Sequence, residues 1–297
     1  MKVLITGASG LIGTALQKSF AAKGYDVIIT TRGEVENDRQ VQWDAEKGFT
    51  NPEKLEGIDA VVHLAGESVA GLRWTDDKKK AIRDSRVNGT RSVVDAIGKF
   101  KEKPSVLVAS SAIGYYGERG DEELTESSAA GDGFLPDVCK AWEAESRRAE
   151  DAGIRTVLLR TGVVLSKDGG ALGTMLTPFK LGVGGVIGDG KQWMSWISLD
   201  DHIEAINFAI ENENLRGAVN SVTPNPVTNE EFTKTMGEVL YRPTFIPLPE
   251  FVVSMALGEM GDALLLASTK VLPKRLENAG FSFKYPELKP AIEHALS

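Results

Sequence analysis

The sequence predicts an α/β fold in which a doubly wound parallel sheet is followed by a smaller mixed α/β lobe. Three observations support this prediction. Strand-like and helix-like segments alternate up to Leu165, several strands are continuous apolar runs, and the sequence becomes rich in glycine afterwards. Alternating strands and helices form parallel sheets with right-handed crossovers, and continuous Val/Ile/Leu runs are typical of strands covered by helices on both faces.

The predicted strands are short runs rich in Val, Ile and Leu. They lie at Lys2–Thr6, Asp26–Thr31, Val41–Trp43, Ala60–Leu64, Ser105–Ser110 and Thr156–Leu165. Helical periodicity is found between these strands, at Leu11–Lys23, Asp76–Phe100 and Pro136–Ala152. We therefore predict a first domain over residues 1–165.

A second domain is predicted over residues 166–297. Glycines punctuate a loop-rich region up to Trp196, and a helix is expected at Asp200–Glu211. Thr228 is followed by Asn-Glu-Glu, which is typical of a helix start. Prolines at positions 243, 247 and 249 indicate a junction before a last module of about residues 247–297.

Composition limits the classes of function. The chain has 297 residues, of which 42% are hydrophobic and 26% charged, with a net charge of −8. This acidic balance disfavours nucleic acid and anionic membranes as partners. The apolar stretch Phe251–Ala267 is interrupted by Glu259 and Asp262, so no membrane span is expected. The single cysteine, Cys139, and a first strand that starts at Lys2 without a signal peptide predict a reducing, cytoplasmic location.

The most informative motif joins the first strand to the first helix. A glycine-rich turn between a buried strand and a helix offers backbone N–H groups and the positive end of the helix dipole to a pyrophosphate. Here Gly7 would allow the tight turn, Gly10 the approach of the phosphates and Gly13 the close packing of helix on strand. The alternative is that the glycines only shape the turn. The motif predicts a dinucleotide-binding Rossmann domain with contacts from Thr6, Gly7, Ser9, Gly10, Leu11, Ile12 and Gly13.

The end of the second strand distinguishes between the two nicotinamide dinucleotides. An acidic residue there binds the ribose 2′-hydroxyl of NAD, whereas an arginine accommodates the 2′-phosphate of NADP. The chain has Arg32 at this point and no carboxylate until Glu34. The guanidinium is a permanently charged fork suited to phosphate, so the sequence favours NADP(H) unless Arg32 is only an exposed loop residue.

Further cofactor contacts are expected at the ends of later strands. Asp44 would accept a hydrogen bond from the adenine amino group, although a surface-turn role is an equal alternative. Leu64, Ala65 and Gly66 would lie under the cofactor, with Gly66 alternatively a plain turn residue. Asn88 stands inside a predicted helix, where an amide is a poor helix former, and this indicates a packing or binding role.

Four motifs resemble those of the extended short-chain dehydrogenase/reductase superfamily. They are Thr6-Gly7-x-x-Gly10-x-x-Gly13, Val61-Val62-His63-Leu64-Ala65-Gly66, Val87-Asn88-Gly89-Thr90 and Ser110-Ser111-Ala112. More closely, the whole chain resembles an atypical branch, the NAD-dependent epimerase/dehydratase-like proteins with cell-division-inhibitor-like members. Three segments carry this resemblance, namely Ser111–Gly117, Trp196–Asp201 and Leu272–Phe283, the last being similar to a C-terminal domain of unknown function.

The resemblance implies reversible hydride transfer between a nicotinamide cofactor and a carbinol or carbonyl carbon of a small molecule. In typical members a serine holds the substrate oxygen, a tyrosine transfers the proton, and a lysine four residues later lowers the tyrosine pKa and orients the ribose. Ser111 matches the serine and Lys140 matches the lysine. Pro136 stands where the tyrosine is expected, so the usual acid/base is missing.

Tyr115 and Tyr116 are the candidates to replace this tyrosine, because they follow Ser111 closely. The alternative is that both only line a substrate cleft. The Tyr285…Lys289 pair has the usual spacing but lies in the C-terminal module, where no catalytic role is expected. The sequence thus predicts an NADP(H)-binding oxidoreductase or epimerase. The alternative function is a regulatory protein that binds NADP(H) without turnover.

The remaining candidates carry weaker predictions. Cys139 and His63 are expected to be packed and inert, and His202 and His294 have no matching ligands, so no metal site is predicted. Substrate specificity is expected in the second lobe and in three loops, at Glu67–Trp74, Gly117–Leu135 and Gly169–Trp196. Trp193, Met194 and Trp196 would either wall a cleft or pack the second lobe. A homodimer through the helices at Asp76–Phe100 and Pro136–Ala152 is expected by analogy.

Overall fold

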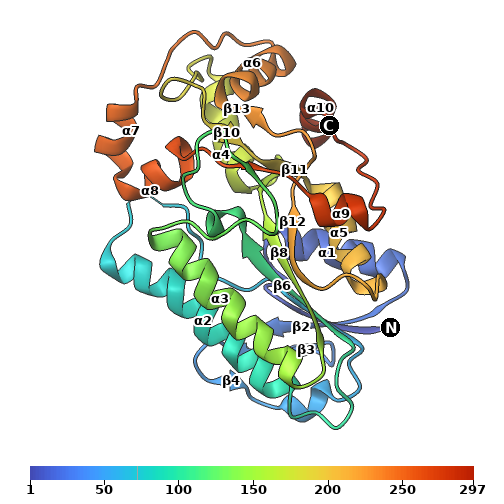
Figure 1. Ribbon diagram of the computed structural model, residues 1–297. Helices are drawn as coiled ribbons and strands as arrows, with labels where there is room; N and C mark the ends of the chain where they lie inside the picture. The colour runs from blue at the N-terminus through green and yellow to red at the C-terminus, as the bar shows by residue number, and fades with distance from the viewer. Residues whose placement is uncertain (72) are drawn as a thin grey trace.

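The computed structural model describes residues 1–71 and 73–297 and is built around an eight-stranded sheet (Figure 1). The strand order is β12-β8-β6-β5-β1-β2-β3-β4, and every pairing is parallel except that of β3 with β4. The strands are β1 Lys2–Thr6, β2 Asp26–Thr31, β3 Gln40–Asp44, β4 Gly48–Phe49, β5 Ala60–His63, β6 Val106–Ala112, β8 Arg155–Thr161 and β12 Gly217–Ser221. The order reverses between β1 and β5, which is where ligands bind to doubly wound sheets.

Helices cover both faces of the sheet, as the continuous apolar strands predict. Figure 1 shows α2 (Asp76–Ile97) beside α3 (Phe134–Asp151) on one face, with α1 (Leu11–Ala22) and α5 (Leu199–Glu211) on the other. Alternate residues of β1 enter the two cores. Val3 and Ile5 pack with Leu16 and Phe20 of α1, whereas Leu4 packs with Val93 and Ile97 of α2. The predicted fold class is confirmed.

The second lobe consists of short strands and helices at the carboxyl edge of the sheet. Its two-stranded sheets pair β10 with β13, β11 with β9, and β14 with β7. Their bounds are β7 Glu123–Leu124, β9 Val163–Leu165, β10 Trp193–Met194, β11 Trp196–Ser198, β13 Val227–Thr228 and β14 Lys270–Val271. The helices are α4 Gly170–Lys180, α6 Asn229–Leu240, α7 Glu250–Leu257, α8 Glu259–Gly261, α9 Lys274–Asn278 and α10 Leu288–Leu296. Single-turn helices are η1 Pro52–Leu55, η2 Ile113–Tyr115 and η3 Asp262–Leu266.

Three elements differ from the sequence prediction. The strand expected over 156–165 divides at Gly162, because a Cβ there would lie 2.6 Å from Ser195 O and β9 turns away to pair with β11. Helix α4 occupies a region expected to be loops. Helix α3 begins two residues before Pro136, and proline is tolerated there because the first helical N–H groups have no partner inside the helix.

Strand β12 comes from beyond residue 165 and completes the sheet by pairing with β8. Helix α5 precedes β12 and covers the sheet with α1, so the chain returns to the first layer after starting the second lobe. Within residues 1–71 and 73–297, no helix is both long and apolar enough to cross a bilayer.

Candidate active site

The turn between β1 and α1 has the geometry of an anion-binding site. Gly7 adopts a φ of 70° and contacts the end of β5, where a Cβ would lie 2.8 Å from Ala65 N. Gly13 fits tightly as well, because its Cβ would lie 2.4 Å from Gly7 O. At Gly10 the nearest atom would be 3.4 Å away, so this side of the turn is open. No described side chain caps α1, so its first N–H groups are left for a ligand at the carboxyl ends of β1, β2 and β5, a region that we call the groove.

The turn is held from below by a buried polar chain. Thr6 Oγ1 lies 2.7 Å from His63 Nδ1 and accepts a hydrogen bond from Ala65 N at 3.2 Å. His63 Nε2 in turn lies 2.9 Å from Thr90 Oγ1 on α2. Burial lowers the pKa of His63 to about 4, so its imidazole is neutral. The Thr6 side chain thus ties β5 to the turn instead of facing the groove.

The rim of the groove carries the other predicted cofactor residues. Ser9 and Gly10 are exposed and Leu11 and Ile12 half-buried on the turn, while Arg32 is exposed just after β2. Asp44 at the end of β3 has a lowered pKa, chiefly because Glu46 N and Lys47 N donate to its carboxylate and further because Arg32 lies near. Leu64 and Ala65 are half-buried after β5, Gly66 is exposed, and Asn88 is half-buried on α2. An uncapped helix end with an arginine at the rim fits a dinucleotide that carries an extra phosphate.

Ser111 has a buried partner that the sequence did not reveal. The register of β6 and β8 pairs Ser111 with Arg160, so both side chains leave the sheet on the α3 side. Ser111 Oγ donates to Glu143 Oε1 at 2.8 Å, and Arg160 Nε and Nη2 donate to Glu143 at 2.7 and 2.9 Å. All three residues are buried: Ser111 is 3% exposed, Glu143 5% and Arg160 3%. The Ser111 hydrogen is therefore directed to Glu143, although the sequence predicted that it would hold a substrate oxygen.

Tyr116 is buried, and hydrogen bonds fix its side chain. Its side chain is fully buried, and its hydroxyl lies 2.6 Å from Asn220 Oδ1 and accepts from Arg160 Nη1 at 3.0 Å. A third contact joins it to Thr125 O at 3.0 Å. Burial raises the pKa of Tyr116 to about 12. With its hydroxyl occupied and no path to a substrate, Tyr116 is a packing residue in this arrangement.

Tyr115 differs from its neighbour in its burial and in the contacts of its hydroxyl. It is half-buried, and the guanidinium carbon of Arg160 lies 3.4 Å from its ring centroid. Its hydroxyl makes no hydrogen bond within the described part of the chain and is not among the buried unpaired atoms there, so it reaches solvent. Asp137 raises the pKa of Lys140 through an ion pair at 2.7 Å, and the nearby Tyr115 phenol adds a smaller contribution.

The segment that carries Tyr115 packs against Pro136. A Cβ at Gly117 would lie 3.3 Å from Pro136 Cγ, and one at Gly114 would lie 3.4 Å from Leu135 Cβ. The first turn of α3, where the sequence resemblance led us to expect a tyrosine, is thus covered by residues 114–117. The fold places Tyr115 near Lys140, whereas Ser111 and Tyr116 are buried in the protein interior.

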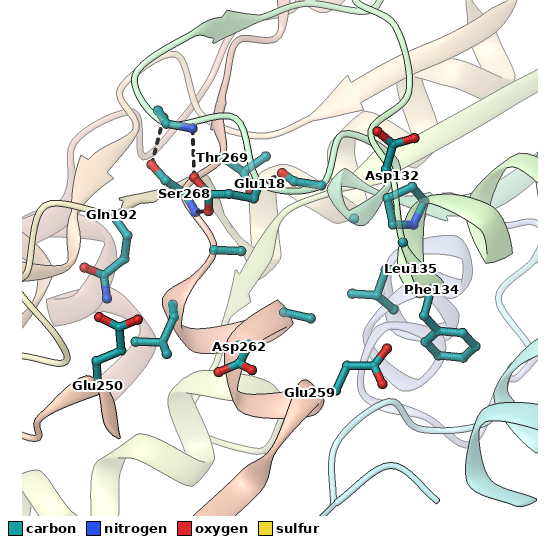
Figure 2. A pocket seen from close by; sticks show the side chains of 18 of the residues that line it. Glu118, Asp132, Phe134, Leu135, Gln192, Glu250, Glu259, Asp262, Ser268 and Thr269 are labelled. Atoms are coloured by element: carbon teal, nitrogen blue, oxygen red, sulfur yellow. Dashed lines mark hydrogen bonds between the residues drawn. The ribbon is translucent and has the colours of Figure 1, made fainter. Parts of the chain in front are cut away.

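A cleft of about 700 Å³ opens beside this segment (Figure 2). Gly114 and Gly117 line it, together with Leu135 and Pro136 of α3 and Trp74 from the loop after β5. Figure 2 shows Glu250, Asp262 and Glu259 along one side of the cleft. The lining is acidic, with Glu118, Asp121, Asp132, Asp189, Glu250, Glu259 and Asp262, whereas Lys191 is the one basic residue among the described lining residues.

The tryptophans of the second lobe divide between the two predicted roles. Trp193 Nε1 donates to Asp121 Oδ1 at 2.8 Å beside the cleft. Trp196 is fully buried in the core of the second lobe, and Met194 packs against that core. Cys139 is also buried, and burial raises the pKa of its thiol to about 12, so it is unreactive.

Comparison with known proteins gives the family. Residues 3–220 match the model of the NAD-dependent epimerase/dehydratase family. The chain belongs to this family. Residues 248–295 match a domain of unknown function, DUF1731, at the place predicted for the C-terminal module. The predicted resemblance is confirmed.

Relatives in the family match the chain over its whole length. Epimerase family protein Mb2239 of Mycobacterium bovis is 41% identical over 293 residues, which cover 99% of this chain and 97% of that protein. The structure of human epimerase family protein SDR39U1 with NADPH has a TM-score of 0.92 and 36% identity and covers 100% of both chains. A nucleoside-diphosphate sugar epimerase from Corynebacterium glutamicum has a TM-score of 0.83 and 36% identity, and the match covers 100% of this chain and 58% of that one.

Sequence reasoning missed Glu143 and Arg160. One signal was present for Arg160, because a charged residue follows the apolar run Val157–Leu159 within a strand that is otherwise buried. Buried arginines need partners, so this position pointed to a polar cluster at the end of β8. Glu143 gave no such signal, since acidic residues are common on helices.

Proposed function

We propose that this protein binds NADP(H) and catalyses reversible hydride transfer at a carbinol or carbonyl carbon of a small molecule. Bound NADPH supplies the hydride. The N–H groups of the Gly7–Gly13 turn would hold the pyrophosphate, Arg32 the 2′-phosphate, and Lys140 the ribose. The NADPH found in the structure of the human relative supports this assignment.

The observation that carries the catalytic part of the proposal is the open hydroxyl of Tyr115. This phenol lies near Lys140 and against the Arg160 guanidinium, and the adjoining Gly117 packs on Pro136, which stands where the superfamily resemblance places the acid/base. A phenol with an open hydroxyl is suited to exchange a proton with a substrate oxygen. In the reducing direction the substrate carbon gains the hydride, its oxygen gains the Tyr115 proton, and solvent reprotonates the phenolate.

The charge of the cleft supports a substrate without a diphosphate. A nucleoside diphosphate needs arginine or lysine side chains, because each phosphate is anionic. The described lining instead provides a row of carboxylates and Lys191. We therefore infer a neutral or cationic carbonyl compound, or the alcohol that corresponds to it.

Cofactor binding is tested by titrating the purified protein with NADPH and NADH and following cofactor fluorescence. We expect tighter binding of NADPH, and Arg32→Ala should weaken it about 10- to 100-fold, as for loss of charge-assisted hydrogen bonds. Arg39→Ala is the matched control, because Arg39 is another exposed arginine on the same loop. Equal affinity of the parent protein for both cofactors contradicts the role of Arg32.

The second candidate function is regulation by cofactor binding without turnover, and Pro136 in place of the tyrosine favours it. Stopped-flow measurement of NADPH oxidation against aldehydes, ketones and nucleotide sugars separates the two. Oxidation by a carbonyl compound that carries no diphosphate supports the first proposal. Tight NADPH binding without oxidation by any member of the panel supports the regulatory function.

A further inference from the structure

We propose that Arg160 and Glu143 are positioning residues: they hold the Tyr115 ring and the Ser111 hydroxyl in place, so that Tyr115 serves as the proton donor instead of the tyrosine missing at position 136. The inference rests on the proposed function, since it takes Tyr115 as the proton donor. It assigns a role to two buried charged residues that the cofactor groove does not use.

The contacts of Arg160 leave its side chain no freedom. Nε and Nη2 form a bidentate pair with Glu143, and Nη1 donates to the Tyr116 hydroxyl at 3.0 Å. The edge of the guanidinium is thereby occupied, and its carbon atom Cζ lies over the Tyr115 ring, 3.4 Å from the ring centroid. A planar cation held at its edge is a rigid platform for an aromatic ring, and stacking of this kind is a property of arginine that lysine lacks.

Stability alone is a weak reason for such an arrangement. Burying an ion pair costs desolvation that its attraction often only offsets, and well-packed apolar residues serve as well in many interiors. The charge of Arg160, however, lies against the one ring whose oxygen becomes negative when the proposed proton leaves. Arg160 restricts this ring and places a positive charge against it, and an apolar replacement would lack that charge.

Glu143 determines the direction of the Ser111 hydroxyl. The carboxylate of Glu143 accepts two hydrogen bonds from the Arg160 guanidinium, which binds it as an acceptor. Ser111 must therefore donate to Glu143, which leaves its oxygen as an acceptor for other groups. A substrate carbonyl then receives its proton from Tyr115 and not from Ser111. In typical members of the superfamily the serine holds the substrate oxygen, whereas the hydrogen of Ser111 is directed to Glu143.

The chain offers a matched control on the same strand. Arg155 at the start of β8 is also partly buried, and its guanidinium donates to three carbonyl oxygens, those of Ala209, Ile210 and Leu215. It lies at the opposite end of β8 from Arg160 and contacts none of the tyrosines named above. Replacing Arg155 therefore removes a structural arginine without touching the proposed positioning pair.

The experiment compares Arg160→Met, Arg160→Lys, Glu143→Gln and Arg155→Met in the full chain. Three quantities are measured: the thermal midpoint, the single-turnover rate of NADPH oxidation, and the rate at which tetranitromethane nitrates Tyr115 in the cofactor-free protein, read by peptide mass spectrometry. We expect Arg160→Met to slow hydride transfer about 10- to 100-fold, as for misplaced catalytic groups, with NADPH affinity unchanged. Nitration of Tyr115 should accelerate severalfold, because the ring is released. Arg160→Lys keeps the buried charge and is included in case Arg160→Met does not fold.

The outcomes separate this inference from the proposed function. Equal effects of Arg160→Met and Arg155→Met on rate and nitration show that Arg160 is structural and overturn the inference. Unchanged nitration of Tyr115 in both Arg160 variants and in Glu143→Gln overturns it as well. Suppose that none of the tested carbonyl compounds makes the parent protein oxidise NADPH, but nitration rises only in the Arg160 and Glu143 variants. The positioning of Tyr115 then stands and the catalytic proposal fails.

Discussion

Tyr115 and Tyr116 are adjacent in the sequence, yet the fold gives their hydroxyl groups opposite environments. The single turn η2 directs Tyr116 into the core, where Asn220 and Arg160 occupy its oxygen. The same turn leaves the Tyr115 hydroxyl open to solvent. One of the pair is available for chemistry and the other is committed to structure.

This contrast predicts a double dissociation between activity and stability. Tyr115→Phe should abolish hydride transfer and leave the thermal midpoint and NADPH affinity unchanged, because no described group loses a partner. Tyr116→Phe should lower the free energy of unfolding by about 1–3 kcal/mol, because buried polar atoms of Asn220 and Arg160 are left unpaired. Urea unfolding and single-turnover kinetics on both variants measure these effects. Loss of activity with native stability in Tyr116→Phe would reverse the assignment.

Sequence reasoning reached some of these residues and could not reach others. Ser111, Lys140 and Arg32 are found by motif, since each stands at a fixed place relative to a strand or a helix. The choice between Tyr115 and Tyr116 depends on the direction of one short turn, which no periodicity encodes. The Glu143–Arg160 pair depends on how α3 packs on β8, and such packing has no local signal.

At the scale of elements, the β1–α1 turn separates two uses of glycine. At Gly13 an added methyl group would overlap backbone atoms, with Ala8 Cα at 2.6 Å and Gly7 O at 2.4 Å. At Gly10 the same methyl group has room inside the protein and would project into the groove. Gly13 serves the packing of helix on strand, and Gly10 leaves room for the proposed ligand.

We therefore expect opposite results from two alanine substitutions. Gly13→Ala should lower the free energy of unfolding by about 1–3 kcal/mol, as overpacking does when backbone cannot retreat. Gly10→Ala should change that free energy by under about 1 kcal/mol, the scale of an N-cap effect, but lose most of the NADPH affinity. Thermal unfolding without cofactor and fluorescence titration with it provide the two measurements. Full NADPH binding by Gly10→Ala would contradict the placement of the pyrophosphate.

The sequence predicts the bounds of elements that have a strong local pattern. It does not predict the bounds that depend on contacts with residues far along the chain. Strands β1 and β2 have the predicted bounds, because each is an uninterrupted apolar or β-branched run next to a turn. The break between β8 and β9 arises where Gly162 meets Ser195 and Val222, residues far along the chain. Helix α4 was hidden because glycines at its start resemble a loop, and α4 is held by its packing in the second-lobe core.

At the scale of the molecule, α5 joins the two lobes. One face of α5 packs on the sheet through Ile203 and Ile206. At its start the buried Asp201 accepts hydrogen bonds from Lys284 N at 2.7 Å and Tyr285 N at 3.0 Å, which secures the C-terminal module. Contacts between residues so far apart in the chain leave no pattern in a single sequence. This is why the sequence did not show that β12 and α5, which follow residue 165, belong to the central layer.

Two buried histidines give the whole molecule a defined pH dependence. Burial lowers the pKa of both His63 and His202 to about 4, from an ordinary value of 6.5. The native protein keeps both rings neutral, whereas the unfolded chain protonates them below pH 6.5. The unfolded state thus binds more protons between these values, so stability is greatest above pH 6.5 and falls as the pH decreases to about 4.

The expected slope is about 1.4 kcal/mol per pH unit for each histidine within this window. Carboxylates with lowered pKa values, such as Glu145 and Glu211, act mainly below their ordinary value of 4.5, so the histidines dominate above it. Urea unfolding between pH 5 and 7 measures the slope, and His202→Asn should halve it while an amide keeps a hydrogen bond to Ser221. The exposed His294, which pairs with Asp200, is the matched control, and its replacement by asparagine should leave the contribution of the two buried rings intact. A stability that does not fall from pH 6.5 to pH 5 would mean that the native state takes up these protons as readily as the unfolded chain does.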